Sequence, residues 1–293
     1  MPEPLLLQHK LERVSTELGR YGRVIVAFSG GVDSTLLLAL ARKALGREGV
    51  IAATADSASL ARADLDEARA LARHLDVPHA VLATGEVENP VYRANSPARC
   101  YVCKRELFDR LRALAQAEGI VTILYGAIED DLLELRPGAA AARECDVRAP
   151  LQAAGLSKAE VREAARAFGL PNWDRPQNAC LASRVPHGLE VTERKLSQVE
   201  AAEQALRTLG FRQVRVRHVG THARVEVGRE ELSRLDQPAV RRDISAQLLA
   251  LGFASVGVDR TGYQAGGADR RAVEEDLLIP SGGVAQLVRA AES

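Results

Sequence analysis

Residues Val24 to Thr35 read VIVAFSGGVDST, and this stretch predicts the centre of the fold. Val24 to Phe28 are apolar or small, which is typical of a short buried strand in a parallel sheet. The strand runs into Ser29-Gly30-Gly31-Val32-Asp33-Ser34, and residues 36–45 then continue with helical spacing. A strand, a glycine turn and a helix N-terminus together form an anion site, because glycine lets the backbone approach a phosphate and the free N–H groups face it.

The loop differs from two common phosphate-binding patterns. It lacks the lysine of a Walker A loop and the third glycine of a dinucleotide fingerprint. It resembles the Ser-Gly-Gly-x-Asp-Ser pyrophosphate loop of enzymes that split ATP between its α and β phosphates. This resemblance implies that Ser29, Gly30, Gly31, Asp33 and Ser34 hold the pyrophosphate and its magnesium. The alternative is an ordinary tight turn between a strand and a helix.

The composition is that of an ordinary soluble globular protein, with 46% hydrophobic and 27% charged residues among 293. This length favours two domains. The 39 basic and 39 acidic residues cancel, so no overall field favours a nucleic-acid partner. Because no apolar run reaches the length of a membrane span and the N-terminus lacks a signal-peptide pattern, we expect a cytoplasmic protein without membrane contact.

Strands and helices alternate through the first part of the chain. After a first helix over 4–19, strands over 50–55, 80–83 and 122–125 alternate with helices over 61–74 and 104–117. This rhythm predicts an α/β fold with a doubly wound parallel sheet, which binds ligands at the carboxyl ends of its strands. Asp56 and Gly126 follow two of these strands, and Asp56 lies where this fold class places adenine and ribose. A loop is expected over 129–138, and Ser157 with Glu160 predicts a capping box at the start of a helix over 157–168.

The pattern changes near residue 188, where we place the boundary between domain 1–188 and a smaller domain 189–267. Helices over 192–209 and 240–251 and strands over 213–219, 224–227 and 255–259 predict an α+β domain with an antiparallel sheet. Leu209-Gly210-Phe211 and Leu251-Gly252-Phe253 end the two helices alike, which indicates a duplicated helix–strand unit. Residues 268–293 show no clear pattern and are expected to form a loose tail.

The four cysteines, at 100, 103, 145 and 180, are expected to serve metal or redox chemistry in a cytoplasmic protein. Cys100 and Cys103 form a CxxC pair at a helix start, which favours thiolates. The pair fits a redox couple, half of a zinc site or part of an iron–sulfur site. No second CxxC completes a four-thiolate zinc site, whereas three thiolates with Cys180 suit a cubane cluster with one open iron. The remaining interpretation is that Cys100, Cys103 and Cys180 are three unrelated core residues. Cys145 is expected to take no part in the site.

Arg215 and Arg217 alternate on one predicted strand, so both can face the same ligand. Their guanidinium groups suit phosphate and carboxylate. A solvated strand face is the alternative. Ser183 and Arg184, beside Cys180, are further candidates for holding a substrate, and Glu203 is a weaker one.

Taken together, these motifs resemble the LarE family, the ATP-dependent sulfur transferases that build the nickel-pincer cofactor of lactate racemase. The resemblance covers residues 24 to about 260. It rests on 28–34, 100–104, 125–126, Asp131 with 136–138, 150–151, 158–162, 171–174, 180–184 with Pro186 and Gly188, and 214–217. One stretch departs from the family pattern, because Gly-Thr-Asn-x-Asp-Asp is replaced by GAIEDD at 126–131. The polar contacts of that threonine and asparagine are therefore missing.

The resemblance implies a reaction and a set of residues. A carboxylate of a pyridinium biscarboxylic acid mononucleotide attacks the α-phosphate of ATP, and a sulfur nucleophile then displaces AMP to leave a thiocarboxylate. Asp33 and Cys180 are the implied catalytic residues, and Asp56 and Gly126 join the loop residues around ATP and Mg²⁺. The implied substrate-binding residues are Lys104, Asp131, Arg136, Ser183, Arg184, Arg215 and Arg217.

Two sulfur sources occur in lineages of this family. One sacrifices a single cysteine, which becomes dehydroalanine, and the other uses three cysteines thought to bind a 4Fe-4S cluster whose open iron carries sulfide. Cys100, Cys103 and Cys180 match the second. We expect a small-molecule nucleotide substrate, a sulfide or cysteine-derived sulfur donor, no nucleic acid and a homo-oligomer. A tRNA thiolase, an ATP-dependent amide synthetase and a non-catalytic nucleotide sensor are the alternatives.

Overall fold

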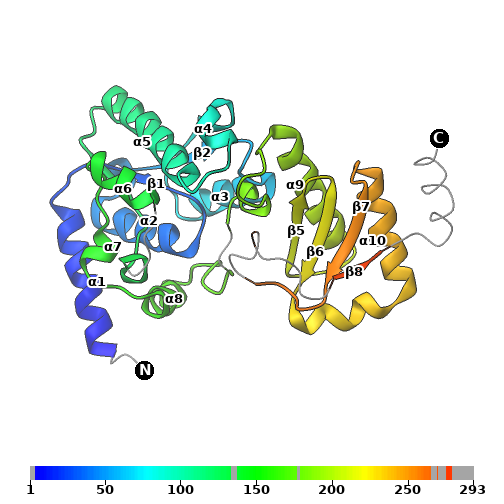
Figure 1. Cartoon of the computed structure of the whole chain (residues 1–293). Coiled ribbons are helices and arrows are strands. Elements are labelled where there is room, and N and C mark those ends of the chain that lie inside the picture. The colour runs from blue at the N-terminus through cyan, green and yellow to red at the C-terminus, as the bar shows by residue number, and fades with distance from the viewer. Residues whose placement is uncertain (1–3, 133–136, 177–178, 265–268, 270–274, 279–293) are drawn as a thin grey trace. The chain divides into compact units, whose positions relative to one another are not determined.

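The computed structural model describes residues 4–132, 137–176, 179–264, 269 and 275–278, and it divides into two compact units. The first unit comprises residues 1–92 and 97–179, and the second comprises 93–96 and 180–293. Figure 1 colours the first unit from blue to green and the second mainly from green to red. Each unit has its own sheet and its own core.

The first unit contains a four-stranded parallel sheet in the order β3-β2-β1-β4. Its strands are β1 (Val24–Ala27), β2 (Val50–Asp56), β3 (His79–Ala83) and β4 (Thr122–Tyr125). The helices are α1 (Pro4–Gly19), α2 (Val32–Leu45), α3 (Arg62–His74), α4 (Pro90–Arg93), α5 (Arg99–Glu118), α6 (Pro137–Glu144), α7 (Pro150–Ala153) and α8 (Lys158–Ala167). Short 3₁₀ turns occur at η1 (Arg47–Gly49), η2 (Glu86–Glu88) and η3 (Glu129–Leu132).

Alternation along β1 places the sheet between two apolar layers. Val24, Val26 and Phe28 belong to one buried cluster with α1, α2 and α8, whereas Ile25 belongs to a second cluster with α5 and α6. Because successive side chains of a strand point to opposite faces, helices cover both faces of this sheet. The predicted doubly wound parallel sheet is therefore confirmed.

The second unit contains the strands β5 (Val214–Val219), β6 (His222–Val227), β7 (Ser255–Asp259) and β8 (Glu275–Leu277), in that order. Its helices are α9 (Glu193–Thr208) and α10 (Pro238–Ala250), with 3₁₀ turns η4 (Leu181–Arg184) and η5 (Arg229–Asp236). One apolar cluster joins both α-helices to one face of this sheet. Leu206, Val216, Val225 and Leu248 in that cluster are all completely buried.

Two expectations for this unit need correction. The sheet is mixed, because β5–β6 and β7–β8 are antiparallel but β6–β7 is parallel. A connection through α10 reverses the chain a second time between β6 and β7, so the two strands run the same way. In addition, β8 lies in the segment expected to be a loose tail; it pairs with β7, and Leu278 is 5% exposed.

The two Leu-Gly-Phe segments adopt the same helix end. Gly210 and Gly252 have φ values of +86° and +93°, which a side chain would strain. The amide of the following phenylalanine donates to a carbonyl of the last helical turn in both cases, Phe211 to Leu206 and Phe253 to Leu248. Both phenylalanines are buried in the same cluster, so each helix enters its strand by the same device.

The segment before α9 is held by residues far from it in sequence. The Asn95 side-chain amide donates to the carbonyls of Val185, Pro186 and Leu189 at 3.1, 2.6 and 2.9 Å. These bonds explain why residues 93–96 group with the second unit, which begins at Cys180 where the sequence suggested residue 189.

Candidate functional site

The predicted pyrophosphate loop joins β1 to α2, and its hydroxyl groups form a closed network. Ser29 Oγ and Ser34 Oγ lie 3.1 Å apart, and the Ser29 amide donates to Ser34 Oγ at 3.3 Å. The Gly31 amide donates to Ser29 Oγ at 3.3 Å. Since the two hydroxyls accept N–H groups of the loop that leads into α2, they stand where an anion would accept the same bonds.

Two glycines allow close backbone approaches at this loop. Gly30 has a φ of +72°, and a Cβ there would lie 3.3 Å from the backbone of Ala68 in α3. Gly126 follows β4, and a Cβ there would lie 2.8 Å from the Ser34 amide nitrogen. Gly126 therefore lies beside the loop as predicted, and its lack of a side chain lets β4 approach the N-terminus of α2.

The Gly30 carbonyl is fixed from a segment well over 100 residues away in sequence. The Asn172 side-chain amide donates to this carbonyl at 2.9 Å and to Thr35 Oγ1 at 3.0 Å, while Arg175 donates to the same carbonyl at 3.3 Å. Arg175 also forms ion pairs with Asp64 at 2.7 Å and Glu67 at 2.8 Å. Because a trans peptide directs its C=O and N–H oppositely, holding the Gly30 carbonyl orients the Gly31 amide toward the loop hydroxyls.

Replacing Asn172 with alanine is expected to weaken ATP binding by about 3- to 10-fold, because one hydrogen bond that orients the Gly31 amide is lost. Isothermal titration with Mg·ATP measures this change. Asn89→Ala serves as the control, because the Asn89 side chain is exposed and, among the described residues, accepts only from the Val91 amide. Unchanged ATP affinity in Asn172→Ala would show that Arg175 alone positions the loop.

Asp33, in the first turn of α2, is paired with Lys158 at the start of α8. The Lys158 ammonium lies 2.7 and 2.8 Å from the two carboxylate oxygens. Burial raises the pKa of Asp33, and the hydrogen bond and charge of Lys158 offset only part of this effect. The negative charge of Asp131 also raises the pKa of Asp33, so Asp131 lies near this carboxylate, and its role in substrate binding stays a prediction.

The other predicted site residues of the first unit have no described link to the pyrophosphate loop. Asp56, at the end of β2, forms an ion pair with Arg62 at 2.5 Å. Lys104 is exposed on α5, and its side-chain stem is the nearest group to Gly138. Arg136 lies outside the described residues. The contacts described for Asp56 and Lys104 do not join either residue to the pyrophosphate loop, so their roles in ligand binding stay predictions.

Arg215 and Arg217 share a face of β5, as predicted, and this face is opposite the apolar one. Val214 and Val216 point into the core, and the two arginines are 9% and 3% exposed. A solvated strand face is therefore excluded. Arg217 pairs with Glu226 at 2.8 Å and donates to the Ser183 carbonyl at 3.2 Å.

Arg184 and Arg215 lie close together around Glu203. Arg184 is 1% exposed and pairs with Glu203 at 2.9 Å, and it also donates to the Cys180 carbonyl at 2.9 Å and to Ser183 Oγ at 3.1 Å. Burial lowers the pKa of Arg215, and the positive charge of Arg184 lowers it further. Burial raises the pKa of Glu203, but Arg184 and its neighbours outweigh this effect and leave it lowered. We call Ser183, Arg184, Glu203, Arg215 and Arg217 the arginine cluster.

The arginine cluster has the chemistry of an anion site. Crowded, buried guanidinium groups gain when an anion enters, because its charge relieves their mutual repulsion. The Arg215 guanidinium also lies 5.0 Å from the Tyr263 ring centre, so an aromatic side chain flanks the cluster. The cluster therefore suits a ligand with a phosphate or carboxylate.

The cysteines differ in environment. Cys100 and Cys180 are exposed, Cys103 is partly buried, and none of the four forms a disulfide. Cys100 and Cys103 lie at the start of α5, as predicted, within its first five residues, while Cys180 immediately precedes η4. Cys145 is 4% exposed and packs in the apolar cluster beneath α5 and α6, which fits a structural residue. Over the described parts of the chain, no three His, Cys, Asp or Glu side chains are arranged to hold a metal.

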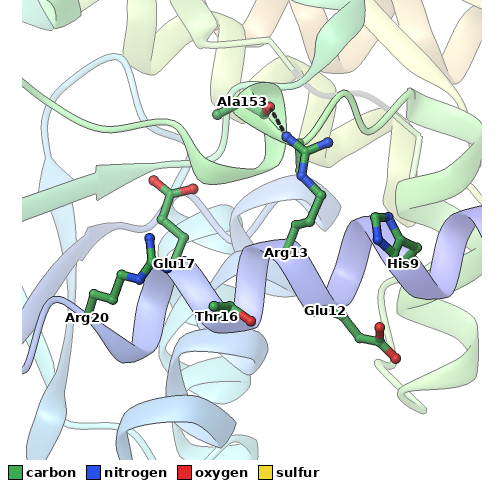
Figure 2. Close-up of a pocket in the computed structure, with 8 residues that line it drawn as sticks. His9, Glu12, Arg13, Thr16, Glu17, Arg20 and Ala153 are labelled. Atoms are coloured by element: carbon green, nitrogen blue, oxygen red, sulfur yellow. Dashed lines mark hydrogen bonds between the residues drawn. The ribbon is translucent and has the colours of Figure 1, made fainter.

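A surface pocket occurs on α1 and α7, and Figure 2 shows its charged lining. Arg13 donates to the Ala153 carbonyl at 3.4 Å, and Glu17 accepts from Tyr21. None of its lining residues is a predicted site residue. No helix among the described residues is long and apolar enough to cross a membrane.

Comparisons with known proteins identify the family of this chain. The chain is 36% identical over 244 residues to the pyridinium-3,5-bisthiocarboxylic acid mononucleotide synthase of Lactiplantibacillus plantarum, covering 83% of this chain and 88% of the relative. The chain belongs to the LarE family. It is also 42% identical over 265 residues to an uncharacterised protein of Synechocystis sp., covering 90% and 98% of the two chains.

More distant matches of this LarE-family chain are partial. A family model described as NAD synthase matches residues 7–119, which lie mostly in the first unit. The argininosuccinate synthase of Halobacterium salinarum is 31% identical over 160 residues, covering 51% of this chain and 40% of the relative.

Three residues at the loop were not predicted as site residues: Lys158, Asn172 and Arg175. The first two lie in segments 158–162 and 171–174, whose likeness to the family was the available signal. Arg175 follows directly after the second segment, and no sequence pattern singled it out.

Proposed function

We propose that this protein is an ATP-dependent sulfur transferase of nickel-pincer cofactor biosynthesis, acting on a pyridinium biscarboxylic acid mononucleotide. The name of the Lactiplantibacillus plantarum relative supports the product class. The pyrophosphate loop supports ATP as the activating substrate, and the arginine cluster supports an anionic co-substrate. The pairing of this loop with this relative is the observation that carries the proposal.

In the first half-reaction, a substrate carboxylate oxygen attacks the α-phosphorus of magnesium-bound ATP. The bond from the α-phosphorus to the bridging oxygen breaks, and pyrophosphate leaves with the electron pair. The Gly31 amide and the Ser29 and Ser34 hydroxyls would bind the pyrophosphate oxygens in place of the bonds that they make with one another. Asp33 would hold the magnesium ion that accompanies ATP, since carboxylates are preferred ligands of Mg²⁺.

The arginine cluster would bind the pyridinium mononucleotide, which carries one phosphate and two carboxylates. Arg215 and Arg217 lie on one face of β5, so they can bind two oxygens of one anionic group. Glu203 orients Arg184 through a two-point ion pair at 2.9 and 3.1 Å. Ser183 contacts both Arg184 and Arg217, which ties the loop after Cys180 to the strand.

In the second half-reaction, a sulfur nucleophile attacks the carbonyl carbon of the adenylate, and AMP leaves with the electron pair of the carbon–oxygen bond. Cys100, Cys103 and Cys180 would hold a 4Fe-4S cluster, and they fit this role in donor chemistry because each carries a thiol that is not in a disulfide and none lies in a core. When bound, the cluster supplies an iron with an open position for a transferable sulfide. The sulfur donor, the homo-oligomer and the cytoplasmic location remain predictions.

Incubating anaerobically purified protein with ATP, Mg²⁺, sulfide and the biscarboxylic acid mononucleotide tests the proposal. We expect AMP and pyrophosphate in equal amounts, together with a product in which one oxygen is exchanged for sulfur, detected by ³¹P NMR and mass spectrometry. ADP and phosphate would show that the loop does not cleave between the α and β phosphates. Thiolation of unmodified tRNA without reaction of the mononucleotide would overturn the substrate assignment.

A further inference from the structure

The ion pair between Lys158 and Asp33 has a consequence for how ATP enters this site. Asp33 is the carboxylate that the proposed function assigns to magnesium, yet the Lys158 ammonium bridges both of its oxygens at 2.7 and 2.8 Å. A magnesium ion and an ammonium group on the same carboxylate repel each other. Metal binding at Asp33 therefore weakens its ion pair with Lys158.

The backbone at Lys158 is held by contacts that are independent of its side chain. The Lys158 amide donates to Asp130 at 2.8 Å, and the Ser157–Glu160 capping box closes the start of α8. Lys10 further anchors this turn through a 2.8 Å ion pair with Glu160. The Lys158 side chain is 29% exposed, and the ammonium has no ion-pair partner besides Asp33 among the residues that the structure describes. A flexible side chain on a rigid helix start can exchange partners.

The other cations near the loop are already committed. Arg175 is held by Asp64, Glu67 and the Gly30 carbonyl, and Arg162 donates to the Arg175 carbonyl at 3.0 Å. Pyrophosphate carries more negative charge than one magnesium ion neutralises, and this charge grows as the bond to the α-phosphorus breaks. Among these cations, Lys158 is the one whose described ion-pair partner is the carboxylate assigned to magnesium, so metal binding frees its charge to meet the pyrophosphate.

We propose that Lys158 is the counter-ion of Asp33 in the nucleotide-free protein and moves to the leaving pyrophosphate when Mg·ATP binds. This inference rests on the proposed function. The partly buried carboxylate is thereby kept paired before the metal arrives, and the same ammonium then neutralises charge on the group that departs. Lys158 acts on the substrate in one state and positions Asp33 in the other.

The exchange predicts opposite effects on two binding reactions, both measurable without the pyridinium substrate. Manganese, followed by electron paramagnetic resonance, replaces magnesium as the probe. In Lys158→Ala, Mn²⁺ alone should bind about 10-fold more tightly because the competing ammonium is gone, whereas Mg·pyrophosphate should bind about 10- to 100-fold more weakly in isothermal titration. Lys158→Gln should behave in the same way, and Lys158→Arg should restore part of the pyrophosphate affinity.

Lys10→Ala is the matched control, because it removes the other lysine that pairs with the first turn of α8. It should lower the melting temperature and leave both affinities unchanged. A parallel loss of Mn²⁺ and pyrophosphate affinity in Lys158→Ala would indicate a merely structural role and overturn the exchange. If the opposite effects appear but the wild-type protein forms no AMP from ATP and a carboxylate, the proposed function fails while the exchange stands.

Discussion

Replacing Asp33 with alanine is expected to reduce AMP and pyrophosphate formation by about 1,000-fold or more, because the loop would lose the carboxylate that we propose as the magnesium ligand. The fold should persist, since the Asp33 side chain is 26% exposed and points toward Lys158 rather than into the core. Rapid-quench analysis of labelled ATP measures the change. Asp33→Asn should be nearly as inactive, because it keeps the shape of the side chain but removes its charge.

Asp66→Ala is the matched control for this variant. Asp66 is an exposed carboxylate on α3 that pairs with Arg69 of the same helix, so its loss should leave the rate unchanged. Full activity in Asp33→Ala would show that another carboxylate, such as Asp131, carries the magnesium ion.

Single replacements of Cys100, Cys103 and Cys180 by alanine are expected to abolish sulfur transfer while leaving adenylation of the substrate intact. A 4Fe-4S cluster held by three thiolates loses its attachment when one is removed, so iron content and the brown chromophore should fall together with activity. Anaerobic purification followed by iron and sulfide analysis provides the readout that is independent of turnover. Zinc in place of iron would instead support a structural metal site.

Cys145→Ala is the control for the thiol variants. Cys145 is 4% exposed in an apolar cluster, so its replacement should cost about 1 kcal/mol of stability and keep the chromophore. A different pattern would identify a sacrificial mechanism. In that case Cys100→Ala and Cys103→Ala remain active, and the wild-type protein loses about 34 Da at Cys180 as its thiol becomes dehydroalanine.

In the first unit, the sequence was sufficient to predict those elements that depend on residues close together along the chain. The apolar run of β1, the glycines after it and the helical spacing that follows predicted a strand, a turn and a helix in the correct order. The Ser157–Glu160 capping box formed as predicted, because its two hydrogen bonds join residues three apart. The alternation of strands and helices along the chain also predicted that helices cover both faces of the sheet.

In the second unit, the same reasoning placed the helices and three strands but misjudged how they pair. Strand direction depends on which strand becomes the neighbour of β6, and the sequence of β7 does not carry that information. The alternation of Arg215 and Arg217 with valines showed that the arginines share a face. It did not show that this face is buried, because that depends on the loop after Cys180 and on Glu203 and Glu226.

By itself, the sequence determined the glycine-rich loop, the doubly wound sheet and the set of cysteines, since each depends on local spacing or residue chemistry. Only the tertiary structure showed which charged and polar groups contact one another. Lys158 lies 125 residues from Asp33, and Asn172 lies 142 residues from Gly30, yet each pair is in hydrogen-bond contact. Such contacts form because α8 packs against α2 through buried apolar residues, and that packing brings polar side chains at the helix ends to the loop.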